Sequence, residues 1–199
     1  MEISATGGWT GDDVSKHHGY SKALAHWIAG YLPRNKWVID LGCGMGYYLH
    51  KLHNSGFRRL IGFEYQPPVD RVFGDVHSLD LTNHFELSRT GNIIFLEVGE
   101  HIPARHQNTV IANVAAAVMP GGKLIMSWAV RGQPGDGHVN CLDNAEVIPL
   151  FVAQGLTYLL EDTLAARAVI ANEECGWFKN TLLIFERRYA ECPTTSNLE

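Results

Sequence analysis

The segment from Val38 to Gly46 constrains the fold of this chain more than any other part of the sequence. Residues 37–39 are apolar and predict a buried strand, which runs into Asp40 and then into a turn with glycines at positions 42, 44 and 46. The residues after Gly46 are apolar at helical spacing. Strand, glycine-rich turn and helix in this order are typical of doubly wound α/β proteins, which bring their backbone close to a nucleotide-like ligand at this point.

The spacing of the glycines separates two classes of cofactor. A dinucleotide-binding turn has the pattern G-x-G-x-x-G and holds a pyrophosphate at the start of the helix. In this chain, Tyr47 stands where the third glycine of that pattern would be. The carboxylate of Asp40 would repel a pyrophosphate, whereas it would accept a hydrogen bond from an ammonium group. The turn therefore disfavours a nicotinamide cofactor and favours a cationic ligand.

The string DLGCGMG at 40–46 resembles the first motif of the class I S-adenosylmethionine-dependent methyltransferases. Three later segments resemble further motifs of this family in order and spacing, and the resemblance covers about residues 20–187. The first of them is the apolar run 60–63, which ends in Glu64, 18 residues after Gly46. An acid at this place accepts hydrogen bonds from both ribose hydroxyls of the ligand.

The remaining two resemblances lie further along the chain. Residues 76–81 predict a strand that ends in an acid. The resemblance implies that Asp80 contacts the adenine amino group and that the adjacent backbone amide, that of Leu81, meets a ring nitrogen; Asp75 is the alternative to Asp80. Residues 93–103 resemble the fourth strand of the family followed by its E-H-I-P segment.

The resemblance implies S-adenosylmethionine as the cofactor. The cofactor-binding residues that it implies are Asp40, Gly42, Cys43, Gly44, Gly46, Glu64, Asp80, Leu81 and Glu97. It also implies an α/β fold with a doubly wound, Rossmann-like sheet of seven mostly parallel strands in the order 3-2-1-4-5-7-6, with helices on both faces. Strand seven is antiparallel in this family.

Periodicity and turn residues predict the other elements. Helices are expected at 21–32, 107–118 and 145–154, and strands at 123–128, 157–160 and 181–185. We expect a flexible N-terminal arm or lid at 1–20, a single methyltransferase domain at 21–190 and a disordered tail at 191–199.

Composition limits the partners of the chain. The net charge is −5, and basic residues cluster only in the pairs 58–59 and 187–188, so nucleic acid is not expected as a partner. No apolar run approaches the roughly 20 residues that span a bilayer, and the N-terminus lacks the features of a signal peptide, so no membrane partner is expected. The four cysteines are scattered without metal-binding spacing. We therefore expect reduced thiols in a cytoplasmic protein and no metal. We also expect a monomer or a homodimer.

The acceptor side of the site has three candidate catalytic residues. His138 lies in a glycine-rich loop whose ordering costs conformational entropy, which makes a purely structural role less attractive, and it is the first candidate for a general base or an acceptor-orienting group. Glu100 and His101 follow the fourth strand and could place a carboxylate and an imidazole near the methyl group. The alternative for His101 is that it starts a helix and packs beside the cofactor. The histidines and aromatic residues of the arm could line a lid or stand in solvent.

The predicted function is methyl transfer from S-adenosylmethionine to a small-molecule acceptor with an O, N or S nucleophile, releasing S-adenosylhomocysteine. Two alternatives remain open: a non-catalytic S-adenosylmethionine-binding subunit of a larger complex, and a protein-directed methyltransferase.

Overall fold

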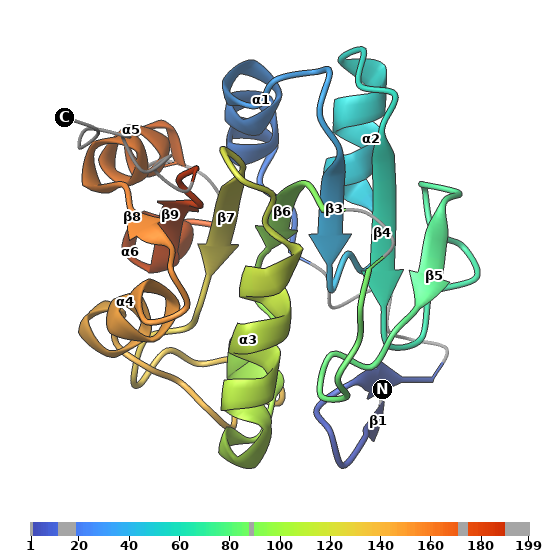
Figure 1. The fold of residues 1–199 in the computed structure, drawn as a ribbon. Helices are drawn as coiled ribbons and strands as arrows, with labels where there is room; N and C mark the ends of the chain where they lie inside the picture. Colours follow the sequence, from blue (N-terminus) through green and yellow to red (C-terminus); the bar gives the residue numbers. More distant parts are fainter. Residues whose placement is uncertain (1, 12–18, 88–89, 171–174, 190–199) are drawn as a thin grey trace, which may run out of the picture.

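A seven-stranded sheet forms the centre of the computed structural model, which describes residues 2–11, 19–87, 90–170 and 175–189 (Figure 1). The strands are β3 (Val38–Leu41), β4 (Leu60–Glu64), β5 (Val76–Ser78), β6 (Asn92–Phe95), β7 (Lys123–Ser127), β8 (Thr157–Tyr158) and β9 (Leu182–Glu186). Their order is β5-β4-β3-β6-β7-β9-β8, and β9 runs antiparallel to both of its neighbours. Numbered along the chain within this sheet, the order is 3-2-1-4-5-7-6, which confirms the predicted topology.

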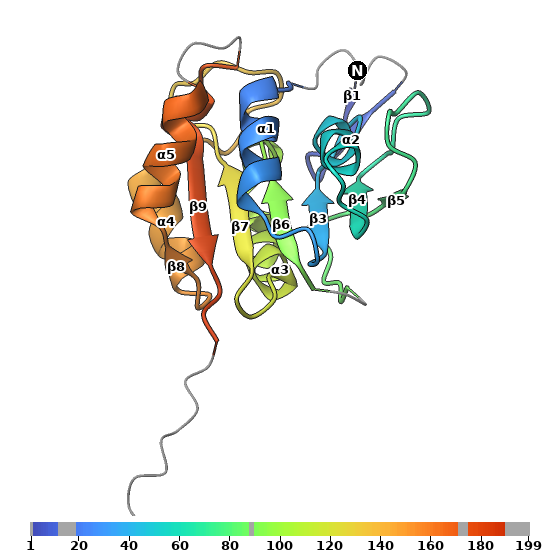
Figure 2. The same ribbon diagram turned by 90° about the horizontal axis from the view of Figure 1, so that it is seen from above.

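Helices cover both faces of the sheet (Figure 2). One face carries α1 (Lys22–Tyr31), α2 (Tyr47–Asn54), α5 (Leu160–Ile170) and the short α6 (Phe178–Thr181). The other face carries α3 (Gln107–Ala117) and α4 (Asn144–Val152). The fold is therefore the doubly wound α/β sandwich that the sequence predicts.

Strands with buried residues on both faces explain why the sheet lies between two helical layers. In β6, Ile93 and Phe95 pack into the cluster under α3 and α4, while Ile94 packs into the cluster under α1, α2 and α5. Successive side chains of a strand point to opposite faces, so an uninterrupted apolar strand needs cover on both.

Two predicted strands end two or three residues earlier than expected. The third ends at Ser78 rather than at residue 81, because the carboxylate of Asp80 accepts hydrogen bonds from the backbone and hydroxyl of Thr82 at 2.9 and 2.7 Å. Such local bonds compete with a strand ladder. The sixth strand ends at Tyr158, since α5 begins at Leu160.

The N-terminal residues form a small hairpin of β1 (Glu2–Ile3) and β2 (Trp9–Thr10), which pair antiparallel and lie outside the main sheet. The turn between them approaches the carboxyl ends of the central strands, as the guanidinium of Arg105 donates a hydrogen bond to the carbonyl of Ala5. The predicted tail at 191–199 lies outside the described residues, and whether the arm is flexible stays a prediction. In the part of the chain that the structure describes, no helix is both long and apolar enough to cross a membrane.

Candidate functional site

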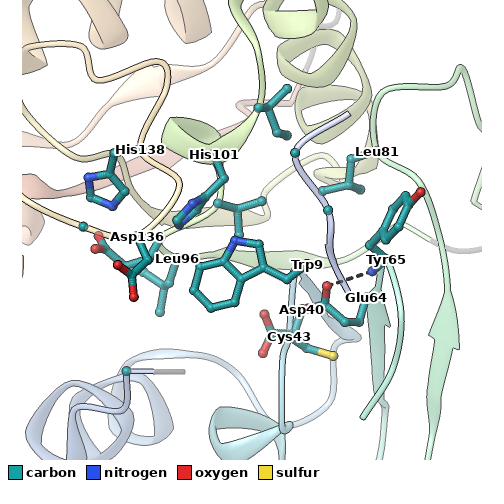
Figure 3. Close-up of a pocket in the computed structure, with 18 of the residues that line it drawn as sticks. Trp9, Asp40, Cys43, Glu64, Tyr65, Leu81, Leu96, His101, Asp136 and His138 are labelled. Atoms are coloured by element: carbon teal, nitrogen blue, oxygen red, sulfur yellow. Dashed lines mark hydrogen bonds between the residues drawn. The ribbon is translucent and has the colours of Figure 1, made fainter. Parts of the chain in front are cut away.

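A cavity of about 420 Å³ lies over the carboxyl ends of the central parallel strands, where open α/β sheets bind their ligands (Figure 3). Its volume is in the range typical of sites for small molecules. The predicted cofactor residues that line it are Asp40, Gly42, Cys43, Glu64, Asp80, Leu81 and Glu97. Gly44 and Gly46 belong to the turn beneath it and do not line it. Of the predicted catalytic residues, His101 and His138 line the cavity, whereas Glu100 lies behind it.

The glycine-rich turn between β3 and α2 needs glycine for two physical reasons. Gly42, Gly44 and Gly46 have φ values of 80°, 51° and 78°, which lie in the left-handed region that favours glycine. A Cβ on Gly42 would also collide with the side chain of Val98, and one on Gly46 would lie 2.7 Å from the Cβ of Phe73. Glycine at these positions therefore lets the backbone of the turn pass close to a ligand in the cavity.

Asp40 is a buried acid at the end of β3, with 2% of its surface exposed. Its Oδ2 atom has no hydrogen-bond partner among the residues that the structure describes. Burial raises the pKa of this carboxyl well above its usual range, and the nearby charge of Glu64 raises it further. A buried carboxylate without a partner is costly, so the site fits a ligand that brings a cation or a hydrogen-bond donor to Asp40.

Glu64 ends β4 and is held in one orientation by two backbone amides. The amide of Gly44 donates to Oε2 at 2.8 Å. The amide of Tyr65 donates to Oε1, also at 2.8 Å (Figure 3). Burial raises the pKa of Glu64, and these two hydrogen bonds lower it. A carboxylate oxygen accepts more than one hydrogen bond, so Glu64 keeps acceptor capacity for a ligand while it fixes the glycine turn.

The structure separates the two acids that were candidates for the adenine contact. Asp80 and Leu81 both line the cavity. Asp75, the alternative to Asp80, is exposed, lies outside the cavity, and pairs with His77 at 2.8 Å. The geometry therefore favours Asp80.

The predicted acceptor side consists of two segments that are joined by backbone hydrogen bonds. Glu100 and His101 lie in a short 3-10 helix (Gly99–His101) after β6, and His138 lies in the loop after β7. The amides of Val139 and Asn140 both donate to the backbone carbonyl of Glu100 at 2.9 Å. These bonds place the imidazoles of His101 and His138 edge to face, with ring centroids 5.0 Å apart.

A buried tryptophan also anchors the loop that follows β7. Trp128 directly follows β7, is fully buried, and donates its indole N–H to the carbonyl of Asn140 at 2.7 Å. The loop that carries His138 is therefore tied to both the core and the 3-10 helix.

Two neighbouring acids, Glu97 and Glu100, lie next to the predicted acceptor residues. Glu97 has a φ of 54°, which is unusual for a residue other than glycine, and its carboxylate accepts a 2.8 Å hydrogen bond from the hydroxyl of Ser127. Burial raises the pKa of Glu97 to about 7, while the hydrogen bonds from Ser127 and Gln133 act in the opposite direction. Burial, and then the charge of Glu97, raise the pKa of Glu100 well above its usual range.

The N-terminal hairpin lies over the cavity and contributes Thr6, Gly7, Gly8 and Trp9 to its lining. The indole of Trp9 packs edge to face against His101, with ring centroids 4.9 Å apart. In the view of Figure 3 this indole lies between the two imidazoles and the carboxylates of Asp40 and Glu64. Lys16, His17 and His18 of the predicted arm lie outside the described residues.

The sequence analysis missed several residues that line the cavity. They are Met45, Tyr47, Tyr48, Tyr65, Thr82, Gln133 and Asp136. Tyr65 could have been found, since it follows Glu64 at the carboxyl end of a strand. Gln133 and Asp136 carry no spacing signal, because their place depends on the path of an irregular loop.

Comparison with known proteins agrees with this geometry. Residues 16–163 match the family described as a methyltransferase domain, so the chain belongs to that family. Its seven-stranded topology and the place of its cavity are those of the class I S-adenosylmethionine-dependent methyltransferases. It is thus an enzyme of this class, and S-adenosylmethionine is its cofactor. A search of curated proteins found no match.

Solved structures show the same fold at low sequence identity. The [4+2]-cyclase SpnF superposes with a TM-score of 0.62 at 15% identity, covering 90% of this chain and 91% of that one. The 1,6-didemethyltoxoflavin-N1-methyltransferase of Burkholderia thailandensis, solved with its substrate and S-adenosylhomocysteine, gives 0.62 at 13%, covering 84% and 78%. A Haloferax volcanii methyltransferase in complex with the activator Trm112 gives 0.60 at 15%, covering 84% and 90%. At these identities the likeness concerns the fold alone.

The buried carboxyl of Asp40 makes cofactor binding depend on pH. In the free protein its pKa is raised, and the cofactor's ammonium group would lower it, so binding releases a proton at pH values between the two pKa values. Affinity should therefore rise with pH below about 7, where the α-amino group of the cofactor still carries its own proton. Calorimetry in buffers of different ionisation enthalpy should detect this proton, and Asp40→Asn should abolish it. Equal proton release in wild type and Asp40→Asn would contradict the assignment.

Proposed function

We propose that the chain transfers a methyl group from S-adenosylmethionine to a small molecule bound between the cofactor and the N-terminal hairpin. The observation that carries this proposal is the division of the cavity into two chemically different parts. One part holds the acids at the ends of β3 and β4, and the other holds Trp9, His101 and His138. Cover by the hairpin supports an acceptor that fits inside a cavity rather than a large polymer.

Each cofactor residue has a role that its environment supports. Asp40 accepts a hydrogen bond from the ammonium group, Glu64 accepts from the ribose hydroxyls, and Asp80 with the amide of Leu81 contacts the adenine. When bound, the cofactor supplies an electrophilic methyl group for in-line displacement. The rigid glycine turn and the anchored Glu64 hold that group in one place, which is the main way in which a protein accelerates such a reaction.

The acceptor residues orient the nucleophile and remove its proton. His138 is the proposed base: as the nucleophile attacks the methyl carbon, the electron pair of the breaking bond returns to sulfur and the proton of the acceptor passes to the imidazole. His101, packed under Trp9, positions the acceptor beside it. Glu100 lies behind both rings and acts on the acceptor only through them.

The charge and the thiols of the chain support the remaining parts of the proposal. A net charge of −5 disfavours a nucleic acid acceptor. Cys43 and Cys141 are free thiols, which suits a reducing compartment, and we propose a cytoplasmic location on this basis. A protein acceptor or a non-catalytic role within a complex would appear in the experiments below as cofactor binding without turnover of small molecules.

Removing the ribose contact should weaken cofactor binding. Glu64→Ala deletes charge-assisted hydrogen bonds worth on the order of 1.5–3 kcal/mol, so affinity for S-adenosylhomocysteine should fall roughly tenfold to a hundredfold. Asp40→Ala should act similarly, and Asp80→Ala less strongly. Asp75→Ala is the matched control, because it removes an exposed acid outside the cavity. The measurement is isothermal titration calorimetry. Unchanged affinity in both Glu64→Ala and Asp40→Ala would remove the basis of the cofactor assignment.

Removing the proposed base should lower turnover without affecting cofactor binding. A general base contributes typically about 10²–10⁴-fold in rate, so His138→Ala should reduce kcat by that order while the affinity for S-adenosylhomocysteine stays near wild type. Transfer of a radiolabelled methyl group to a panel of small acceptors provides the assay, with His77→Ala as an exposed control. A change in the acceptor KM alone would make His138 an orienting residue, and no change in either parameter would sink the acceptor-side assignment.

A further inference from the structure

The three predicted catalytic side chains meet at one point. Glu100, His101 and His138 each offer a ligand atom, and these atoms all lie within 4.8 Å of one another. No metal was expected from the sequence, because the cysteines are scattered without metal-binding spacing. His101 and His138 lie 37 residues apart in the chain, so their proximity has no signal in the spacing. Two imidazoles and one carboxylate are a set that binds divalent metals in proteins.

Glu100 provides a second, independent observation. Its residue is 0% exposed, and within the part of the chain that the structure describes neither carboxylate oxygen has a side-chain hydrogen-bond partner or a well-aligned backbone donor. The backbone amides of Glu100 and Ala129 face the carboxyl and lower its pKa, but burial outweighs them. Its charged neighbour Glu97 is another acid, which makes the burial more costly. Buried carboxylates are normally paired, hydrogen-bonded or bound to a metal ion. A cation between Glu100 and the two imidazoles would satisfy it.

We propose that Glu100, His101 and His138 bind a divalent first-row transition metal ion on the acceptor side of the cavity. The imidazole pair favours such an ion over Mg²⁺, which prefers oxygen ligands. Both imidazoles line the cavity and Glu100 lies behind it, so the unfilled coordination positions face the acceptor. This is the arrangement of catalytic metal sites, which keep a position open.

The loop after β7 holds the imidazole of His138 in an orientation that suits a metal ligand. Nδ1 of His138 donates to the carbonyl of Gln133 at 3.2 Å, which leaves the lone pair of Nε2 for a metal ion. Residue 135 is a glycine, and a Cβ there would collide with Nε2. The amide bonds to the carbonyl of Glu100 already hold the two segments together. Ligands at about 2.0–2.2 Å from one tetrahedral ion lie roughly 3–3.5 Å apart, so binding would draw the three ligand atoms closer together than they are here.

The metal would change how the acceptor loses its proton, and this part rests on the proposed function. A hydroxyl bound to the ion has a lowered pKa, so its proton can leave to solvent before the oxygen attacks the methyl carbon. His138 is then a ligand rather than the base. The inference narrows the acceptor to a molecule that presents an oxygen ligand.

Binding of Co²⁺ to the metal-free full chain, without a polyhistidine tag, tests the inference directly. We expect one ion per chain, with visible absorption bands of Co²⁺ bound by nitrogen and oxygen, and displacement by Zn²⁺ but not by Mg²⁺. Loss of an outer partner of a metal ligand typically costs about 10–100-fold in affinity, so Glu100→Gln and His138→Gln should each cost at least about 100-fold. His77→Gln, at an exposed histidine, should bind as wild type does.

Two further measurements keep the outcomes distinct. His138 lies on a loop, so His138→Gln tests the site even where Glu100→Gln lowers the melting temperature. Wild-type affinity for Co²⁺ in His138→Gln, or no stoichiometric binding by the wild type, would overturn the metal site. S-adenosylhomocysteine affinity is measured on the same samples. If cofactor binding and turnover stay intact in the presence of a chelator, the metal site is refuted and the proposed function stands. If the chain does not bind the cofactor, the proposed function is refuted.

Discussion

The burial of Asp40 at the end of β3, beside the fixed carboxylate of Glu64, is the interaction on which the rest of the site depends. Two acids at neighbouring strand ends repel each other and are poorly solvated, so their ionised forms are unfavourable for the protein alone. The backbone amides of Gly44 and Tyr65 donate hydrogen bonds to Glu64, while one oxygen of Asp40 has no partner in the described part of the chain. The sheet therefore supplies a site whose electrostatics are completed by a cationic ligand.

The residues of the proposed acceptor side are positioned by backbone hydrogen bonds between two segments, and not by their place at a strand end. The carbonyl of Glu100 receives two amides from the loop after β7, and Trp128 anchors that loop in the core. The same connection brings His138 against His101 and leaves the carboxylate of Glu100 buried behind them. The predicted cofactor residues and the proposed acceptor residues lie in one cavity because β3, β4, β6 and β7 all have their carboxyl ends at the same edge of the sheet.

Residues at strand ends could be predicted from the sequence, whereas those placed by irregular segments could not. Asp40, Glu64 and the glycine turn are defined by a buried strand and a fixed spacing, and the strand order followed from the family resemblance. His138 was a candidate from its loop composition, yet its contact with His101 depends on long-range amide bonds that leave no trace in spacing. The position of Trp9 over the cavity likewise depends on long-range side-chain contacts, such as the packing of its indole against His101. The early end of β5 reflects a side-chain bond of Asp80 that propensity does not report.

The central claim is that the strand-end acids select a cationic methyl donor and exclude a dinucleotide. Calorimetric titration of the full chain with S-adenosylmethionine, S-adenosylhomocysteine and NAD under one set of conditions tests it most directly. We predict saturable binding of one equivalent of each of the first two ligands and no measurable binding of NAD, whose pyrophosphate would meet Asp40. Binding of NAD at comparable affinity, or no binding of either sulfur ligand, would contradict it.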